Sequence, residues 1–195
     1  MPNPIISHQA PALYLKTKFP KWIDDVAICI GALVPDLVIS NELRYISHSL
    51  LGQIYWTVPL TVILSILYCK YITSFLSNIA RKKGFIPNLL QYFGVDDWGI
   101  TKSKKFDKRF FVVASYSALI GGLTHLLFDF PSHPYVELFF PWDIFPLYEF
   151  LWISGVIWVI EDISLFITSL YLLRMIKKKD LIRSWYTLKL NYSKK

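Results

Sequence analysis

Uncharged apolar stretches are the feature that most constrains how this chain can fold. Residues 50–69 (LLGQIYWTVPLTVILSILYC) and 110–124 (FFVVASYSALIGGLT) carry no charged side chain, and residues 150–173 carry only Glu161 and Asp162. About 20 consecutive apolar residues are enough for a helix to cross a bilayer. The composition agrees, because 54% of the residues are hydrophobic and only 18% are charged. We therefore predict an all-α, polytopic integral membrane protein.

The pattern of apolar and polar segments predicts about five helices in a single integral membrane domain over residues 1–195. They are expected at about 7–16, 22–34, 47–77, 109–130 and 149–175. The first two are short, and Pro59 is expected to kink the third. Residues 81–108 are predicted to form a polar cytoplasmic linker without a helix, and residues 177–195 a basic tail. Residues 131–148 contain four prolines and many aromatic side chains, which predicts an interfacial or re-entrant loop.

Basic residues gather where the long apolar segments end. They occupy residues 81–83, 102–109 and 174–179. These positions fall on one side of a membrane if the long helices alternate in direction, and an excess of Lys and Arg marks the cytoplasmic side. The net charge of +7 is therefore attributed to membrane flanks, and nucleic acid is not expected as a partner. Trp98, Trp142 and Trp152 are expected to be interfacial anchors.

All four histidines of the chain are predicted to lie on the side opposite the basic residues, together with two aspartates. The predicted metal ligands are His8, Asp36, His48, His125, Asp129 and His133. His125 and Asp129 are four residues apart, so a helix presents both side chains on one face. Nitrogen and oxygen ligands in this mixture favour one or two zinc ions, with iron or manganese as alternatives. A single histidine at a helix end is more often structural, so the prediction depends on the whole set.

Other charged and small residues admit more than one interpretation. Arg44 lies one helical turn before His48, where it could bind a phosphate group. Glu161 and Asp162 could serve the metal site or could be protonated groups bonded to another helix. The pair Asp24–Asp25 is more typical of solvated or paired charges than of catalytic groups. The pair Gly121–Gly122 predicts close helix packing.

Four stretches of the sequence carry a resemblance to a known family. They are SH (7–8), GALVPD (31–36), SHSLLG (47–52) and GGLTHLLFD (121–129) with His133 behind it. Together they resemble a prokaryotic membrane family, domain of unknown function 4184, which is close to families described as membrane-bound metal-dependent hydrolases. The resemblance covers roughly the first 135 residues and implies a prokaryotic membrane protein. We expect it in the bacterial cytoplasmic membrane, and the charge pattern predicts that the His/Asp cluster lies near the non-cytoplasmic face.

A more distant resemblance is to the helical fold of zinc-dependent phospholipase C and zinc nucleases. That fold holds zinc with an Asp, a His, an HxxxD helix and a further His, and the same order occurs here in Asp36, His48, His125, Asp129 and His133. The fold has additional ligands near its C-terminal end. This chain has no histidine after His133, so Glu137, Glu149 or Glu161 would have to supply them.

These observations lead to one functional hypothesis and two alternatives. The hypothesis is a metal-dependent hydrolase acting on a phosphoester or lipid-like substrate at the bilayer surface, with membrane lipids as partners. The metal would generate hydroxide from bound water, Asp129 or Asp36 would orient that water, and Arg44 would bind the anionic group. The alternatives are a non-enzymatic membrane protein with a structural metal or polar cluster, and a small metal or proton transporter. The oligomeric state is not predicted.

Overall fold

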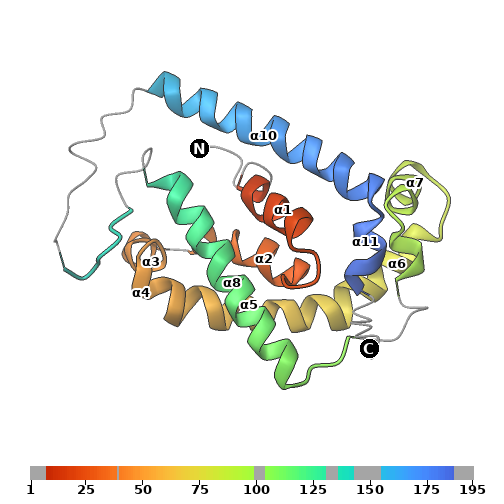
Figure 1. Cartoon of the computed structure of the whole chain (residues 1–195), viewed down its shortest axis with the longest axis horizontal. Helices are drawn as coiled ribbons and strands as arrows, with labels where there is room; N and C mark the ends of the chain where they lie inside the picture. The colour runs from red at the N-terminus through yellow and green to blue at the C-terminus, as the bar shows by residue number, and fades with distance from the viewer. Residues whose placement is uncertain (1–7, 39, 99–103, 131–135, 143–154, 187–195) are drawn as a thin grey trace.

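The regular structure of the chain is entirely helical over the residues that the computed structural model describes, 8–38, 40–98, 104–130, 136–142 and 155–186 (Figure 1). The elements are α1 (Gln9–Lys18), α2 (Asp25–Gly31), η1 (Val34–Asp36), α3 (Asn41–Ser47), α4 (Leu50–Gly52), η2 (Gln53–Thr57), α5 (Val58–Leu67), η3 (Tyr68–Ile72), α6 (Thr73–Ala80), α7 (Phe85–Tyr92), η4 (Val95–Asp97), α8 (Lys108–Asp129), α10 (Gly155–Lys178) and α11 (Leu181–Tyr186). The predicted all-α class is confirmed.

Two short helices lie in the middle of the molecule. Figure 1 shows α1 and α2 between α10 on one side and the segment α4 to α6 on the other. Helix α8 packs against both α2 and α5. The contact between α2 and α8 is close because both helices carry glycine there. A Cβ on Gly31 would lie 2.6 Å from the Ala118 carbonyl oxygen, and one on Gly121 would collide with the Ile28 carbonyl oxygen. The close packing predicted at Gly121–Gly122 is thus present.

The longest helix is continuous from Leu50 to Ala80 and comprises α4, η2, α5, η3 and α6. Its start was predicted three residues earlier. The chain breaks at Ser49, because the Ser49 hydroxyl accepts the Gly52 N–H at 2.9 Å and caps a new helix. The two irregular turns, η2 and η3, are π-helical. Pro59, where a kink was predicted, lies in the first turn of α5, and the π-helical turn η2 ends two residues before it.

The linker predicted for residues 81–108 is not a simple loop. It contains α7 and η4, and Trp98 is buried, with its Nε1 donating a hydrogen bond to the Ile182 carbonyl oxygen at 3.1 Å. Trp98 is therefore a core residue that attaches this segment to α11, and its prediction as an interfacial anchor was wrong. Lys104 was expected to flank the membrane as a solvated cation, but it is buried.

Two helices among the described residues are long and apolar enough to cross a membrane: Leu50–Ala80 and Lys108–Asp129. Only 28% of the most apolar window of the first helix is buried, whereas the core helix of a soluble protein is mostly buried. The structure therefore has fewer candidate spans than the predicted polytopic bundle requires. The predicted interfacial loop falls mostly outside the described residues, as do the first residues of the predicted fifth helix and the end of the tail.

Candidate metal centre

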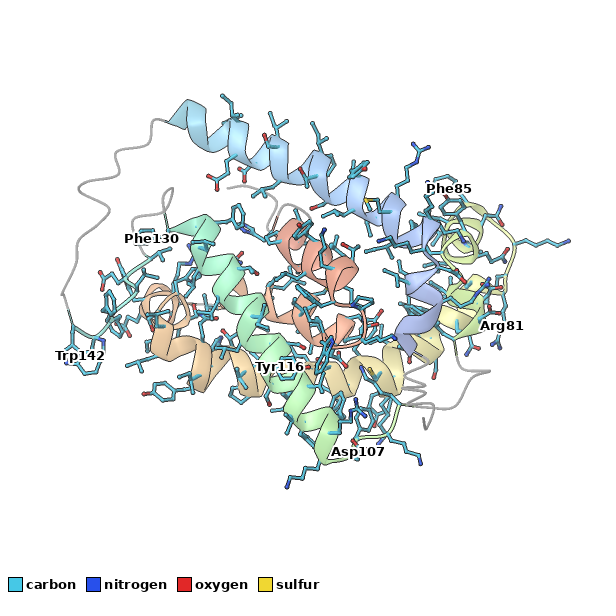
Figure 2. All side chains as sticks on the ribbon, in the orientation of Figure 1. Arg81, Phe85, Asp107, Tyr116, Phe130 and Trp142 are labelled. Carbon is cyan, nitrogen blue, oxygen red and sulfur yellow. The ribbon has the colours of Figure 1, made fainter. Side chains whose placement is uncertain are left out.

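The last turns of α8 carry the two residues of the HxxxD motif. His125 and Asp129 are both buried, and His125 Nε2 lies 3.1 Å from Asp129 Oδ2. The neighbouring part of α8 carries Gly121 and Gly122, which let α2 and the long helix approach closely. A bulkier residue at either position would push these helices away from the end of α8, which Phe130 marks in Figure 2. The helix packing therefore places the motif inside the protein.

Two further ligand candidates come from the short elements between α2 and the long helix. Asp36 ends the 3-10 turn η1, and His48 is the C-terminal capping residue of α3. Ser47 connects them, since its hydroxyl donates to the Pro35 carbonyl oxygen at 2.9 Å and lies 3.0 Å from His48 Nδ1. The prediction that His48 opens the third helix was wrong, because that helix begins only after Ser49.

The side chains of Asp36, His48, His125 and Asp129 converge so that one ligand atom from each lies within 4.8 Å of the others. His48 Nε2 lies 3.3 Å from His125 Nε2, 3.6 Å from Asp129 Oδ2 and 3.5 Å from Asp36 Oδ1, and His125 Nε2 lies 3.8 Å from Asp36 Oδ1. Bonds of 2.0–2.2 Å to zinc in a tetrahedron separate the ligand atoms by about 3.4 Å. The distances that involve a histidine nitrogen, 3.1–3.8 Å, lie close to that spacing.

Both histidines turn the same nitrogen toward the cluster. His125 Nδ1 lies 2.9 Å from the Ala32 carbonyl oxygen, and His48 Nδ1 lies 3.0 Å from the Arg44 carbonyl oxygen. A carbonyl oxygen only accepts, so each Nδ1 carries a hydrogen, and each ring in its neutral form presents a lone pair on Nε2. Histidines that bind metals are held in this way by an outer hydrogen bond. In that form the two Nε2 lone pairs, 3.3 Å apart, repel each other, and a proton or a metal ion between them removes the repulsion.

The charges of the cluster also favour a cation. Burial alone would raise the pKa of Asp36, but its contacts with His48 and the charge of His125 lower this pKa below the ordinary value. Burial alone would lower the pKa of His48, but its bonds to Asp129 and Asp36 raise it. The raised pKa of His48 favours a proton on Nε2 in front of the two carboxylates, and a divalent ion at that place would supply the same positive charge. The Asp36 side chain is 21% exposed while the other three are buried, so the cluster opens to its surroundings at Asp36.

The remaining predicted site residues lie at different distances from this cluster. His8 Nε2 contacts Asp129 Oδ1 at 3.3 Å, and its ring centre is 4.6 Å from that of His125, so His8 borders the cluster on the outer oxygen of Asp129. Arg44 contributes its carbonyl oxygen to the support of His48, and its side chain is half-buried. Glu137 is exposed. His133 and Glu149 lie outside the described residues.

Glu161 is half-buried on α10. Within the part of the chain that the structure describes, no hydrogen bond or ion pair joins Glu161 to the four ligand candidates. Both interpretations of Glu161, metal ligand and protonated structural group, therefore stay predictions.

A second buried charged cluster was missed as such from the sequence. Asp24, at the N-terminus of α2, pairs with Lys104, and Lys104 Nζ lies 3.9 Å from Asp25 Oδ1. Lys16 Nζ lies 3.9 Å from the other oxygen of Asp25 and donates to the carbonyl oxygens of Pro20 and Ile23. Asp24 and Asp25 were correctly predicted to be paired, but they are not solvated. The cluster lies at the opposite end of α8 from the histidines.

Over the described residues the protein is therefore helical, with a mostly buried His/Asp cluster that could hold a metal ion. The comparison with known families agrees with the motifs in the sequence. The family model described as Domain of unknown function (DUF4184) matches residues 1–145, and the chain belongs to this family. The match includes the four cluster residues Asp36, His48, His125 and Asp129. No curated protein and no solved structure gave a match.

Proposed function

We propose that this protein is a membrane-bound metal-dependent hydrolase whose metal is held by Asp36, His48, His125 and Asp129. The observation that carries the proposal is the pair of imidazole Nε2 atoms 3.3 Å apart, each ring fixed through Nδ1 by a carbonyl oxygen. A site built in this way has two neutral nitrogen ligands and two carboxylates, a set that zinc accepts and that iron or manganese also accept.

The proposed hydrolysis follows from the four ligand candidates and from the exposure of the site at Asp36. A divalent metal in such a site lowers the pKa of a bound water and supplies hydroxide near neutral pH. Asp36 is the ligand candidate at the exposed edge, so it is the group placed to accept a proton from an incoming water and to meet the substrate. His8 supports the buried side through Asp129 Oδ1. We assign phosphoesters of lipid-like molecules as the substrate class, with Arg44 as the anion-binding group.

Membrane attachment is supported by apolar side chains that face outward on three long helices. The exposed ones include Ile54, Tyr55, Ile63, Leu67 and Tyr71 on the long helix, Phe111, Val112, Leu123 and Leu127 on α8, and Ile160, Ile163, Phe166, Ile167 and Leu170 on α10. Exposed apolar side chains in this number on long helices are typical of a contact with lipid or protein. A bilayer around these helices would bring lipid substrates to the protein.

The first experiment measures bound metal by elemental mass spectrometry on protein purified in detergent. Wild type is compared with His125→Ala and Asp129→Asn, and Asp97→Asn serves as the control, because Asp97 is a partly exposed carboxylate paired with Arg183. About one equivalent of zinc, iron or manganese in wild type and control, lost in the two site variants, is the expected result. Wild type without metal after reconstitution removes the proposal. Folding of each variant is checked by circular dichroism.

A structural metal site is the competing function, and the burial of three of the four ligand candidates favours it. A structural site has a closed ligand shell, whereas a catalytic metal keeps an open position. X-ray absorption on the metal-loaded protein separates the two. A water or added phosphate in the first coordination sphere, together with hydrolysis of phosphoesters lost in Asp36→Asn, supports the enzyme. Four protein ligands with no exchangeable position support the structural role.

A further inference from the structure

Helix α7 turns an apolar face away from the rest of the protein. The exposed side chains of this face are Phe85 (83% exposed), Ile86 (63%), Leu89 (48%) and Tyr92 (55%). Their spacing of i, i+1, i+4 and i+7 places them on one side of the helix. On the inner side Leu90 packs against an apolar core cluster. A surface helix of a soluble protein has polar side chains outward instead, so the apolar face of α7 needs a partner.

Helix α7 is attached to the rest of the protein at the point where the long helix ends. The Gln91 side-chain amide donates a hydrogen bond to the carbonyl oxygen of Ala80, the last residue of the long helix. Figure 1 shows α7 at the end of the molecule where α6, α10 and α11 meet, and Figure 2 labels Phe85 and Arg81 there. The apolar face of α7 is therefore held at a defined place beside the long helix.

The length of the long helix places α7 at a membrane surface. The helix has 31 residues, so it is roughly 46 Å long, whereas the hydrocarbon core of a bilayer is about 30 Å thick. Exposed Tyr71, Ile72 and Phe75 continue its apolar surface into α6, and only residues 81–84 separate it from α7. This step rests on the membrane attachment in the proposed function and is independent of the metal centre.

Three lysines border the apolar face of α7, and we call them the basic rim: Lys82, Lys83 and Lys177. Lys82 and Lys83 directly precede the helix and are exposed. Lys177 comes from α10, and its Nζ lies 4.9 Å from the centre of the Tyr92 ring. None of the three lysines forms an ion pair with a residue that the structure describes. The basic rim thus places unbalanced positive charge next to an apolar surface.

The acidic residues at this end of the molecule do not offset the basic rim. Residues 81–98 and 174–183 contain eight basic and three acidic side chains. Two of the three acids share one arginine, since Arg183 Nε lies 2.7 Å from Asp97 Oδ2 and Arg183 Nη1 lies 3.2 Å from Asp180 Oδ2. A partner that complements both the apolar face and the basic rim must therefore combine apolar groups with negative charge.

We propose that α7 lies in the surface of the membrane, with its apolar face among the acyl chains and its basic rim on the headgroups of anionic phospholipids. Helices that lie in a membrane surface combine an apolar face with flanking lysines in this way. An anionic leaflet attracts such lysines. Lysine covers apolar surface with its stem while its ammonium group reaches the headgroups, and Lys177 already extends over Tyr92 in this manner.

Charge argues against two other occupants of the apolar face. A second copy of the chain, related by a two-fold axis, would bring the basic rim against the same rim of its partner. The end of the chain, residues 187–195, contains three lysines and no acidic residue, so the rim would repel it. An anionic lipid surface has the charge that both of these lack.

Spin-label depth measurements on the full-length protein in lipid nanodiscs test this placement. A label at Leu89→Cys, in a background with Cys29 and Cys69 replaced by alanine, lies at the centre of the apolar face. Its collisions with oxygen, which dissolves among acyl chains, are compared with its collisions with a water-soluble nickel complex. Asn88→Cys is the matched control, an exposed polar position on the same helix. Ile63→Cys reports on the long helix, where Ile63 is 54% exposed.

In discs that contain phosphatidylglycerol, we expect the labels at Leu89 and Ile63 to meet mainly oxygen and the label at Asn88 to meet mainly nickel. A Leu89 label in water beside an Ile63 label in lipid overturns this proposal and leaves membrane attachment intact. Both labels in water remove the membrane attachment as well. A Leu89 label shielded from both reagents means that protein covers the face, which also overturns the proposal, and dipolar broadening between labels then identifies a second copy.

The role of the basic rim is tested with the same label. Replacing phosphatidylglycerol by phosphatidylcholine, or introducing Lys82→Gln with Lys83→Gln, is expected to lower the ratio of oxygen to nickel collisions at Leu89 by at least about threefold. The matched control replaces two exposed lysines at the start of α8, Lys105→Gln with Lys108→Gln, and should leave the ratio unchanged. An equal ratio in both lipids and in the Lys82/Lys83 variant overturns the recognition of anionic lipid.

Discussion

Replacing either of two adjacent aspartates in the second buried cluster by asparagine is expected to change the stability of the protein in opposite directions. Asp24 is the main partner of Lys104. Asp25 lies 3.9 Å from both Lys104 and Lys16, and burial raises its pKa from 3.8 to about 6 despite the two cations. Ionised Asp25 is therefore unfavourable in the folded protein, whereas ionised Asp24 balances a buried lysine. The substitutions Asp25→Asn and Asp24→Asn separate these two roles.

The size and the sign of the stability change in Asp25→Asn follow from the pKa of Asp25. The folded state binds the Asp25 proton more tightly than the unfolded state does, so wild-type stability falls as the pH rises from about 4 to about 6. Each pKa unit corresponds to about 1.4 kcal/mol, so the full loss is roughly 3 kcal/mol above pH 7. Asparagine resembles the protonated acid, keeps an oxygen for the Val26 N–H and avoids that loss. Asp25→Asn is thus expected to stabilise at pH 8 by about 1–3 kcal/mol and to be neutral at pH 4.

Asp24→Asn is expected to destabilise by about 3–5 kcal/mol, because removing one partner leaves the buried Lys104 charge without its closest anion. The hydrogen bond from the Ala27 N–H, which caps α2, is kept in the variant, since an amide oxygen also accepts. The assay is denaturant unfolding in detergent, followed by tryptophan fluorescence at pH 4 and pH 8. The reasoning is refuted if Asp25→Asn is less stable than wild type at pH 8, or if its effect is the same at both pH values.

Three further predictions concern packing and the support of the metal centre. Gly121→Ala should destabilise by about 1–3 kcal/mol in the same unfolding assay, since the new Cβ collides with the Ile28 backbone. Ser47→Ala should weaken metal binding by about 10–100-fold in a chelator competition, because the Ser47 hydroxyl holds both the His48 ring and the Pro35 turn. Trp98→Phe should cost about 1–3 kcal/mol through the lost hydrogen bond to the Ile182 carbonyl oxygen and the smaller buried ring; an unchanged unfolding midpoint would contradict this role of Trp98.

Much of the candidate site could be predicted from local sequence patterns. The spacing of His125 and Asp129 is a property of any helix, and α8 forms over the predicted range because its apolar run is long and begins at an Asp107 cap. The convergence of His48 and Asp36 on that motif followed from counting helices and their directions. The residues at every fourth position from Gln53 to Ser77 are equally local, since this spacing can be read directly from the sequence. That they form the buried face of the helix depends on its packing against α2 and α8.

The sequence by itself determined the helical class, the long apolar segments and the motifs, because these depend on periodicity and on residues a turn apart. Tertiary structure alone decided which charges are buried. Lys104 has the sequence context of a solvated lysine, and only its contact with Asp24, 80 residues away, makes its burial tolerable. In the same way His8 reaches Asp129 across the fold, and the helix predicted to begin at His48 is interrupted at Ser49. Such pairings between distant residues arise from packing, which no local pattern encodes.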